Sequence, residues 1–234
     1  MTTTAADSPA VDVAPGMIVV FSDLMCPFAH VTIHRLFTAR SRLGLDEQVR
    51  LDHHAFPIEL LNRAPGTRHG SDSEVPVLGR LEPDAGWQLW QGPDYHYPST
   101  VLLAFEAVQA AKAQSLGASE RLDRALRRAF WAASRPIHIH HEILAIAATV
   151  EGLDADRLDA DLRAGTSRHA VFDDYATAST DAVTMSPHLF LPDGTSLANP
   201  GITVHWQGDW AKGFPVIDSD DPTVIERMLA TAAA

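Results

Sequence analysis

Cysteine is almost absent from this chain, since Cys26 is the only one among 234 residues. A single cysteine excludes any internal disulfide. Long apolar runs are absent too, because none approaches the ~20 residues that a membrane-spanning helix requires. Residues 1–15 lack the basic and apolar segments of a secretory signal, and they predict a disordered lead-in. We therefore expect a cytoplasmic protein.

Positive charge is scarce as well. The 18 Lys and Arg residues face 30 Asp and Glu residues, which gives a formal net charge of -12. Phosphate backbones and anionic lipids are bound by clustered Lys and Arg, so this balance argues against a general affinity for nucleic acid or for membranes. A chain of this length can form one domain, or one domain that carries an insertion.

Hydrophobic patterning predicts an α/β fold. Bulky and β-branched residues predict strands at residues 17–21 and 49–55, and the helix expected between them at residues 27–43 completes a β-α-β unit. Gly, Pro, Asp and Ser are frequent from residue 64 to residue 98. That stretch is expected to be a loop with at most one short helix.

The middle of the chain has apolar residues at helical spacing. This spacing predicts four successive helices at residues 100–116, 120–133, 143–150 and 154–164. Two further strands are expected at residues 189–191 and 202–206. A last helix is expected to begin at Asp221 and Pro222, with Asp as its cap and Pro at its first position. The order indicates an all-α insertion between two halves of one sheet.

Cys26 lies where an apolar strand-like run meets a helix-like run. Pro27 is favoured at the first helical position, which leaves Cys26 at the N-cap, beside the unpaired backbone N–H groups of the first turn. Those groups favour the thiolate, the form of cysteine that attacks disulfides. Cys26 is therefore a candidate nucleophile. The alternative is a buried cysteine that acts as a small hydrophobic residue.

The segment Cys26-Pro27-Phe28-Ala29 after its strand resembles the start of the thioredoxin fold in the DsbA family, which carries a Cys-Pro-x-Cys site. Ala29 stands where that family usually has its second cysteine, so the chain resembles a monothiol variant. The resemblance covers residues 17–205 and is most marked for the branch typified by the polyketide-associated protein FrnE.

A second motif, Ser186-Pro187 at the start of an apolar strand, resembles the cis-proline loop of that fold. The resemblance implies that this loop lies against Cys26. It also implies that Ser186 and Pro187 bind the partner, together with Pro27 and Phe28 beside the thiol.

The implied architecture is a thioredoxin-like α/β fold with a helical insertion between its β-α-β half and its C-terminal β-β-α half. We expect the thioredoxin-like domain to comprise residues 16–62 and 180–234. The inserted helical region is expected to comprise residues 63–179.

Two titratable residues flank the candidate nucleophile. His30 lies four residues after Cys26, on the same side of the expected helix, and a protonated imidazole there would stabilise the thiolate. The alternative for His30 is packing without a catalytic part. A carboxylate at Asp23 would act oppositely and raise the pKa of the thiol.

Other candidate features carry less weight. His138, His141 and Glu142 would share one helix face, but no further ligand is evident, and we expect no metal site. Large aromatic residues could line an apolar cleft near the thiol, although core packing is their commoner use. These residues are Trp87, Trp90, Tyr95, Tyr97 and Trp206.

One thiol limits the chemistry, because an external thiol must resolve any mixed disulfide. The sequence therefore predicts a monothiol-disulfide oxidoreductase or isomerase, a monomer or homodimer with no resident cofactor. Its cosubstrate would be a small thiol such as glutathione or mycothiol, and its substrate a disulfide, a protein or a polyketide-type small molecule. One alternative is a thiol-cosubstrate enzyme resembling kappa-class glutathione transferases or 2-hydroxychromene-2-carboxylate isomerases. The other is a binding module without redox activity.

Overall fold

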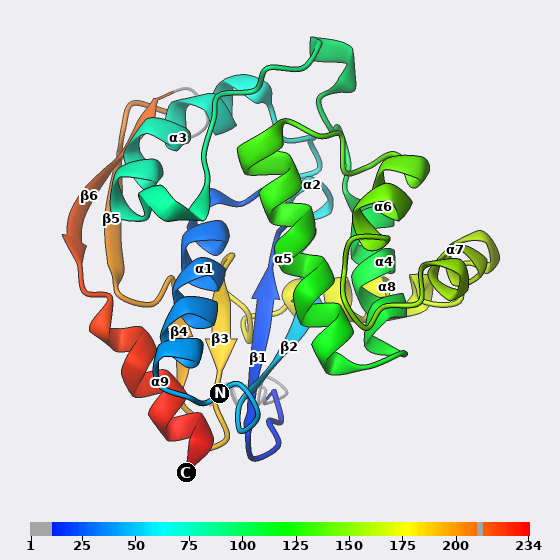
Figure 1. The fold of residues 1–234 in the computed structure, drawn as a ribbon. Helices are drawn as coiled ribbons and strands as arrows, with labels where there is room; N and C mark the ends of the chain where they lie inside the picture. Colours follow the sequence, from blue (N-terminus) through cyan, green and yellow to red (C-terminus); the bar gives the residue numbers. More distant parts are fainter. Residues whose placement is uncertain (1–10, 210–212) are drawn as a thin grey trace, which may run out of the picture.

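A four-stranded sheet lies at the centre of the protein, whose computed structural model describes residues 11–209 and 213–234. The strand order is β2-β1-β3-β4 (Figure 1). β1 pairs in parallel with β2, and β3 pairs antiparallel with both β1 and β4. The strands are β1 Met17–Ser22, β2 Arg50–Ala55, β3 His188–Phe190 and β4 Ser196–Ala198.

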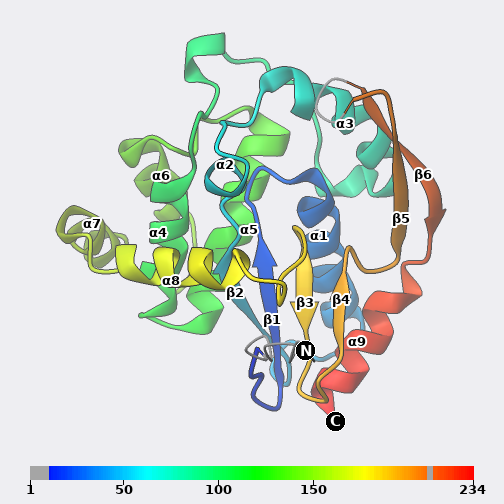
Figure 2. The same cartoon turned by 180° about the vertical axis from the view of Figure 1, so that it is seen from behind.

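Successive side chains of β1 point to opposite faces of the sheet, and they are buried on both faces. Ile18 and Val20 pack with residues of α1 (Pro27–Arg42) and α9 (Thr223–Ala233). Val19 and Phe21 face the opposite side, in a cluster with Val183. Figure 2 shows α8 (Arg168–Ala178) on that opposite side, where it crosses β2.

The remaining helices follow β2 in the chain. They are α2 Ile58–Leu61, α3 Arg68–Leu81, α4 Leu102–Lys112, α5 Leu116–Ala133, α6 His140–Ala147 and α7 Ala155–Ala164, with short 3-10 turns at Pro83–Ala85 and Asp94–His96. Helices α4 to α8 share an apolar core that includes Leu122, Leu126 and Ile143. That core reaches the sheet through Leu24 and Ala55. The expected α/β fold with a helical insertion is confirmed.

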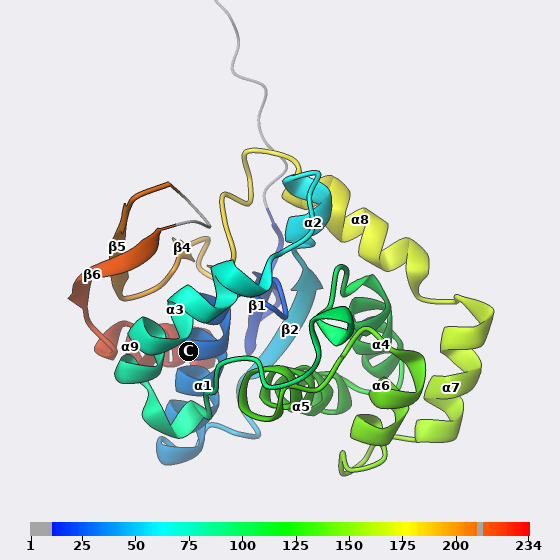
Figure 3. The same cartoon turned by 90° about the horizontal axis from the view of Figure 1, so that it is seen from above.

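The stretch expected to be mostly loop contains a full helix, α3. The Thr67 side chain caps it by accepting the Gly70 N–H at 3.1 Å, and the buried Val75 and Leu78 hold it against the protein. Figure 3 shows α3 above α1 and apart from α4 to α7. Its contacts are with α1 and β6 (Phe214–Asp220), so part of the inserted region covers the thioredoxin-like half.

Other predictions about strands and helices also need correction. The strand predicted at residues 202–206 is β5 (Ile202–Gln207), but it leaves the main sheet and pairs with β6 in a separate antiparallel ribbon. The fourth strand of the main sheet is β4, which the pattern missed. α8 was also missed, because Val171, Tyr175 and Ala178 give only a weak apolar stripe.

Candidate functional site

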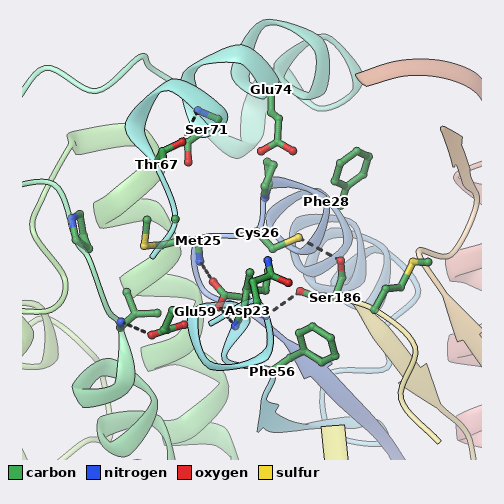
Figure 4. A pocket seen from close by; sticks show the side chains of 18 of the residues that line it. Asp23, Met25, Cys26, Phe28, Phe56, Glu59, Thr67, Ser71, Glu74 and Ser186 are labelled. Carbon is green, nitrogen blue, oxygen red and sulfur yellow. Dashed lines mark hydrogen bonds between the residues drawn. The ribbon is translucent and has the colours of Figure 1, made fainter. Parts of the chain in front are cut away.

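Cys26 is the N-cap residue of α1, and Pro27 takes the first helical position, as the sequence predicts. The thiol donates a hydrogen bond to the carbonyl oxygen of Ser186, with a distance of 3.2 Å between sulfur and oxygen (Figure 4). The peptide bond between Ser186 and Pro187 is cis. The Cys26-Pro27 segment and the Ser186-Pro187 loop, 160 residues apart in the sequence, are therefore in direct contact.

Hydrogen bonds hold the loop with Ser186 against the strand that leads to the thiol. The Ser186 hydroxyl accepts the backbone N–H of Asp23 at 2.8 Å. The Pro187 carbonyl accepts the N–H of Asn199 at 2.8 Å, just past the end of β4. Contacts on both sides of the loop fix the Ser186 carbonyl relative to the sulfur.

The charge state of Cys26 is the opposite of the one expected. The side chain is only 7% exposed, and this burial raises the pKa of the Cys26 thiol to about 12, although Ser186 and the Ala29 amide act in the opposite direction. The carboxylates of Glu74 and Asp23 raise it further. The predicted thiolate at the helix N-terminus is wrong, because desolvation outweighs the effect of the first-turn N–H groups on the pKa of Cys26.

His30 does not reach the thiol. Its ring is buried against Trp87, with 4.6 Å between ring centroids, and its Nε2 lies 3.4 Å from the Gly86 carbonyl oxygen. Burial, with Arg127 nearby, lowers the pKa of His30 to about 3, so the ring is neutral. An imidazolium that stabilises a Cys26 thiolate is absent from this arrangement, and the packing alternative describes His30.

Cys26 opens into a cavity of about 460 Å³. The β1–α1 connection, α2, α3, the segment before α4, the loop with Ser186 and strand β5 all contribute to its wall. Pro27, Phe28 and Ser186 line it as expected, whereas Pro187 is not among the lining residues. Apolar side chains make up much of the remaining surface, namely Met25, Phe56, Ile58, Val101, Met185, Val204 and Trp206.

Three carboxylates also line this cavity, from Asp23, Glu59 and Glu74. Burial and the nearby Glu59 raise the pKa of Asp23 to about 7. Burial alone raises the pKa of Glu74 to about 8. The predicted effect of Asp23 on the thiol is confirmed in direction, since its charge raises the pKa of Cys26.

The sequence reasoning missed Glu59 and Glu74. Both lie on helices, α2 and α3, in or next to the stretch expected to be loop. Glu74 follows Gly70 by four positions, and both line the cavity. A helix predicted over this stretch would have placed both residues on the same helix face.

Of the aromatic residues proposed for a cleft, only Trp206 lines the cavity. Trp90 is buried in the helical core, and Trp87 and Tyr97 pack against that core. Tyr95 is 81% exposed. For most of these residues, core packing is therefore the observed role.

Side chains of the histidine-rich segment at residues 138–142 contact charged groups nearby. His140 Nε2 lies 2.8 Å from a carboxylate oxygen of Asp159, and Glu142 pairs with Arg135 at 2.9 Å. Within residues 11–209 and 213–234, no group of three or more His, Cys, Asp or Glu side chains is arranged to hold a metal ion. Across the same residues, no helix is long and apolar enough to cross a bilayer.

Fold and site together define a thioredoxin-like protein with one thiol at the start of its first helix. The family model of the DSBA-like thioredoxin domain matches residues 17–203, and the chain belongs to this family. The resemblance to the DsbA family is thereby confirmed. The FrnE-like branch stays a prediction.

Several solved structures share this fold. Cytosolic disulfide reductase DsbM from Pseudomonas aeruginosa is 17% identical, with 77% of this chain and 87% of that chain covered and a TM-score of 0.60. A probable DsbA oxidoreductase from Streptomyces coelicolor is 18% identical, with 92% and 89% covered and a TM-score of 0.63. DsbM with GSH is 14% identical, with 78% and 89% covered and a TM-score of 0.61. No curated protein matches the chain.

Proposed function

We propose that the protein catalyses thiol-disulfide exchange through Cys26 alone, with an external low-molecular-weight thiol as the resolving partner. The observation that carries this proposal is the Cys26 sulfur, 3.2 Å from the Ser186 carbonyl and open to a cavity large enough for a small disulfide. Ala29 stands in place of a second thiol and is fully buried, so the chain has no resolving group of its own.

The reaction has two exchange steps. Cys26 loses its proton, and its sulfur attacks one sulfur of a disulfide, which forms a mixed disulfide and releases the other half as a thiolate that takes up a proton. An external thiolate then attacks the substrate sulfur of the mixed disulfide and regenerates the Cys26 thiol. The net result exchanges one half of the disulfide for the external thiol, with no net change in oxidation.

The residues around the thiol have separate roles in this scheme. Pro27 sets the start of α1, and Phe28 supplies an apolar wall. Ser186 is proposed to contact the substrate next to the reacting sulfur, and Pro187, which lies outside the cavity lining, to position Ser186 through its hydrogen bond with Asn199. DsbM with GSH gives a precedent for a thiol partner in this fold, and glutathione and mycothiol are the candidates. We place the reaction in the cytoplasm, where small thiols keep disulfides reduced.

A second candidate function follows from the protonated state of Cys26. A buried thiol that donates a hydrogen bond can orient a bound small thiol, as a hydroxyl would, in a transferase or isomerase that uses a thiol as cosubstrate. In that case the Cys26 sulfur never forms a covalent bond to the substrate or to the bound thiol. Replacement by serine would preserve the hydrogen bond and the activity.

Cys26→Ser distinguishes these two functions. Exchange of a small disulfide, such as cystamine, with an external thiol is followed with and without protein. For the oxidoreductase, we expect the protein-dependent rate to fall to the uncatalysed rate in Cys26→Ser, because no sulfur remains to attack. A Cys26→Ser protein that retains the full protein-dependent rate would contradict the proposal. Because the wild-type chain has one cysteine, any adduct in its intact mass lies on Cys26.

A further inference from the structure

The carboxylates of the cavity have no cationic partner. Elsewhere in the protein, acidic side chains pair with Arg, Lys or His in many places, such as Glu120 with Arg40. Asp23, Glu59 and Glu74 form no ion pair with any residue in the described part of the chain. Burying charge without a partner costs free energy, so an unpaired acidic wall calls for an explanation.

Glu74 is the most isolated of the three. Figure 4 shows its side chain extending from α3 toward Cys26. No hydrogen bond or ion pair to its carboxylate is found among residues 11–209 and 213–234, and burial is the sole cause that raises its pKa. A carboxyl group that is enclosed, unpartnered and directed into a cavity is suited to a ligand that brings the missing partner.

Asp23 and Glu59 are satisfied by neutral groups. Asp23 accepts backbone N–H groups from Met25 at 2.6 Å and from Ile58 at 3.1 Å. Glu59 accepts the N–H of Val101 at 2.9 Å and the hydroxyl of Thr100 at 3.0 Å. These bonds fix both carboxylates in place without neutralising them.

Nearby arginines form no ion pair with the cavity carboxylates, although the charge of Arg127 acts to lower the pKa of Asp23. The described lining of the cavity includes no Lys, Arg or His. Arg127 reaches Asp23 only at its main-chain carbonyl, at 2.7 Å, and its ion pair is with Asp123. Arg68, at the start of α3, is held by Asp72 and Asp94. The field inside the cavity is therefore set by carboxylates.

We infer that the Cys26 cavity selects low-molecular-weight thiols and disulfides that carry an ammonium group near the sulfur, and that it discriminates against those that carry carboxylates. This inference rests on the proposed exchange reaction and adds its substrate class. An ammonium group would pair with Glu74 and would place a positive charge beside the sulfur. Of the two thiols proposed above, glutathione carries two carboxylates and would be the poorer partner for this cavity, whereas mycothiol carries neither a carboxylate nor an ammonium group.

The same charge would activate the nucleophile. Cys26 is held as a thiol because burial and the carboxylates both oppose the thiolate. A cation bound within a few ångströms favours the deprotonated form, so the correct substrate would itself raise the thiolate fraction. In the exchange step, the thiol proton passes to solvent or to a pocket carboxylate, and the new bond joins Sγ to the substrate sulfur.

A matched series of disulfides tests this inference. Cystamine, 2-hydroxyethyl disulfide and 3,3'-dithiodipropionate have the same two-carbon spacing and end in a cation, a neutral group and an anion. The rate of adduct formation on Cys26 is measured by intact mass and divided by the rate of the same disulfide with 2-mercaptoethanol, which removes differences in intrinsic reactivity. We expect the normalised rate for cystamine to exceed that for the anion by at least about tenfold, as ~1.4 kcal/mol of electrostatic preference would give.

Two variants separate the pocket from the overall charge. Measured at pH ~8.5, above the raised pKa of Glu74, Glu74→Gln should lower the cation-to-anion ratio by about threefold or more, because it removes an unpaired charge from the cavity wall. Glu151→Gln changes the net charge equally at an exposed position outside the cavity, and it should leave the ratio unchanged. Equal normalised rates for the three disulfides, or equal effects of the two variants, would overturn the inference.

A binding measurement distinguishes failure of the exchange function from failure of the selectivity for cationic ligands. 1,6-Diaminohexane has the length of cystamine without its disulfide, and hexanedioate is the matching anion. We expect the diamine to raise the melting temperature of wild type more than that of Glu74→Gln, and hexanedioate to raise neither. Adducts with all disulfides at equal normalised rates would keep the exchange function and reject the selection. Diamine binding through Glu74 without adducts would reject the exchange function and keep the cationic site.

Discussion

Two charged regions adjoin the β1–α1 connection, and they differ in the partners of their carboxyl groups. On one side, Arg127 pairs with Asp123 at 2.7 Å and donates to the Ser22 hydroxyl at 2.7 Å. On the other side, Asp23 and Glu74 line a cavity whose described lining includes no Lys, Arg or His. Arg127 contributes to lowering the pKa of Asp123 despite burial, whereas burial raises the pKa of Asp23 to about 7 and that of Glu74 to about 8.

The comparison shows that an arginine decides the state of a buried carboxyl group. Paired with Arg127, Asp123 stays charged, and Arg127 ties α5 to the end of β1 through the Ser22 hydroxyl and the Asp23 carbonyl. Without an ion-pair partner, Asp23 and Glu74 have raised pKa values, so both retain protons near neutral pH and weaken the fold once ionised. The first region is structural. The second has the features of a site whose partner arrives from solution.

Removal of Arg127 should have the largest effect, because it turns the paired region into an unpaired one. Arg127→Met would leave the buried Asp123 without a cation and is expected to destabilise the protein by about 3–5 kcal/mol. The free energy of unfolding in denaturant measures this loss. Arg163→Met is the matched control, since its ion pair with Asp159 is exposed and should contribute at most ~0.5 kcal/mol. Equal losses in the two variants would contradict the comparison.

Glu74→Gln should have a smaller effect of the opposite sign. The pKa of Glu74 in the folded protein is raised to about 8 from 4.5, so the folded state holds this proton after the unfolded chain has lost it. Stability therefore falls as pH rises between these two values, and Gln removes the loss. We expect Glu74→Gln to equal wild type near pH 4 and to exceed it by about 1–2 kcal/mol near pH 9.

Denaturation at several pH values measures that difference. A gain for Glu74→Gln that is independent of pH would indicate a packing effect. If Glu74→Gln were less stable than wild type above pH ~8, the Glu74 carboxylate would have a stabilising partner, contrary to the structure.

The sequence predicted the reacting end of the site and missed its walls. Cys26 and Pro27 mark a helix start by themselves, and the resemblance to the DsbA family paired them with Ser186. Local pattern cannot show that desolvation at Cys26 exceeds the effect of the first-turn N–H groups, since burial depends on residues from across the chain. The charge state of the thiol was therefore predicted wrongly.

The same limit explains α3 and β5. Gly70, Pro76 and Gly79 made the α3 stretch read as loop, although Thr67 caps the helix and Val75 and other apolar residues pack it. Such tertiary packing overrides propensity. The pattern of β5 correctly predicted a strand, but the choice between the main sheet and a ribbon with β6 depends on pairing that periodicity does not encode.

The central claim is that burial, reinforced by the carboxylates of Glu74 and Asp23, keeps Cys26 protonated. The most direct test is the rate of alkylation of Cys26 by neutral iodoacetamide as a function of pH. With the pKa raised to about 12, we predict a rate far below that of a free thiol at neutral pH, still rising at pH ~10 without a plateau. A plateau below pH ~8 would show a stabilised thiolate and would contradict the account.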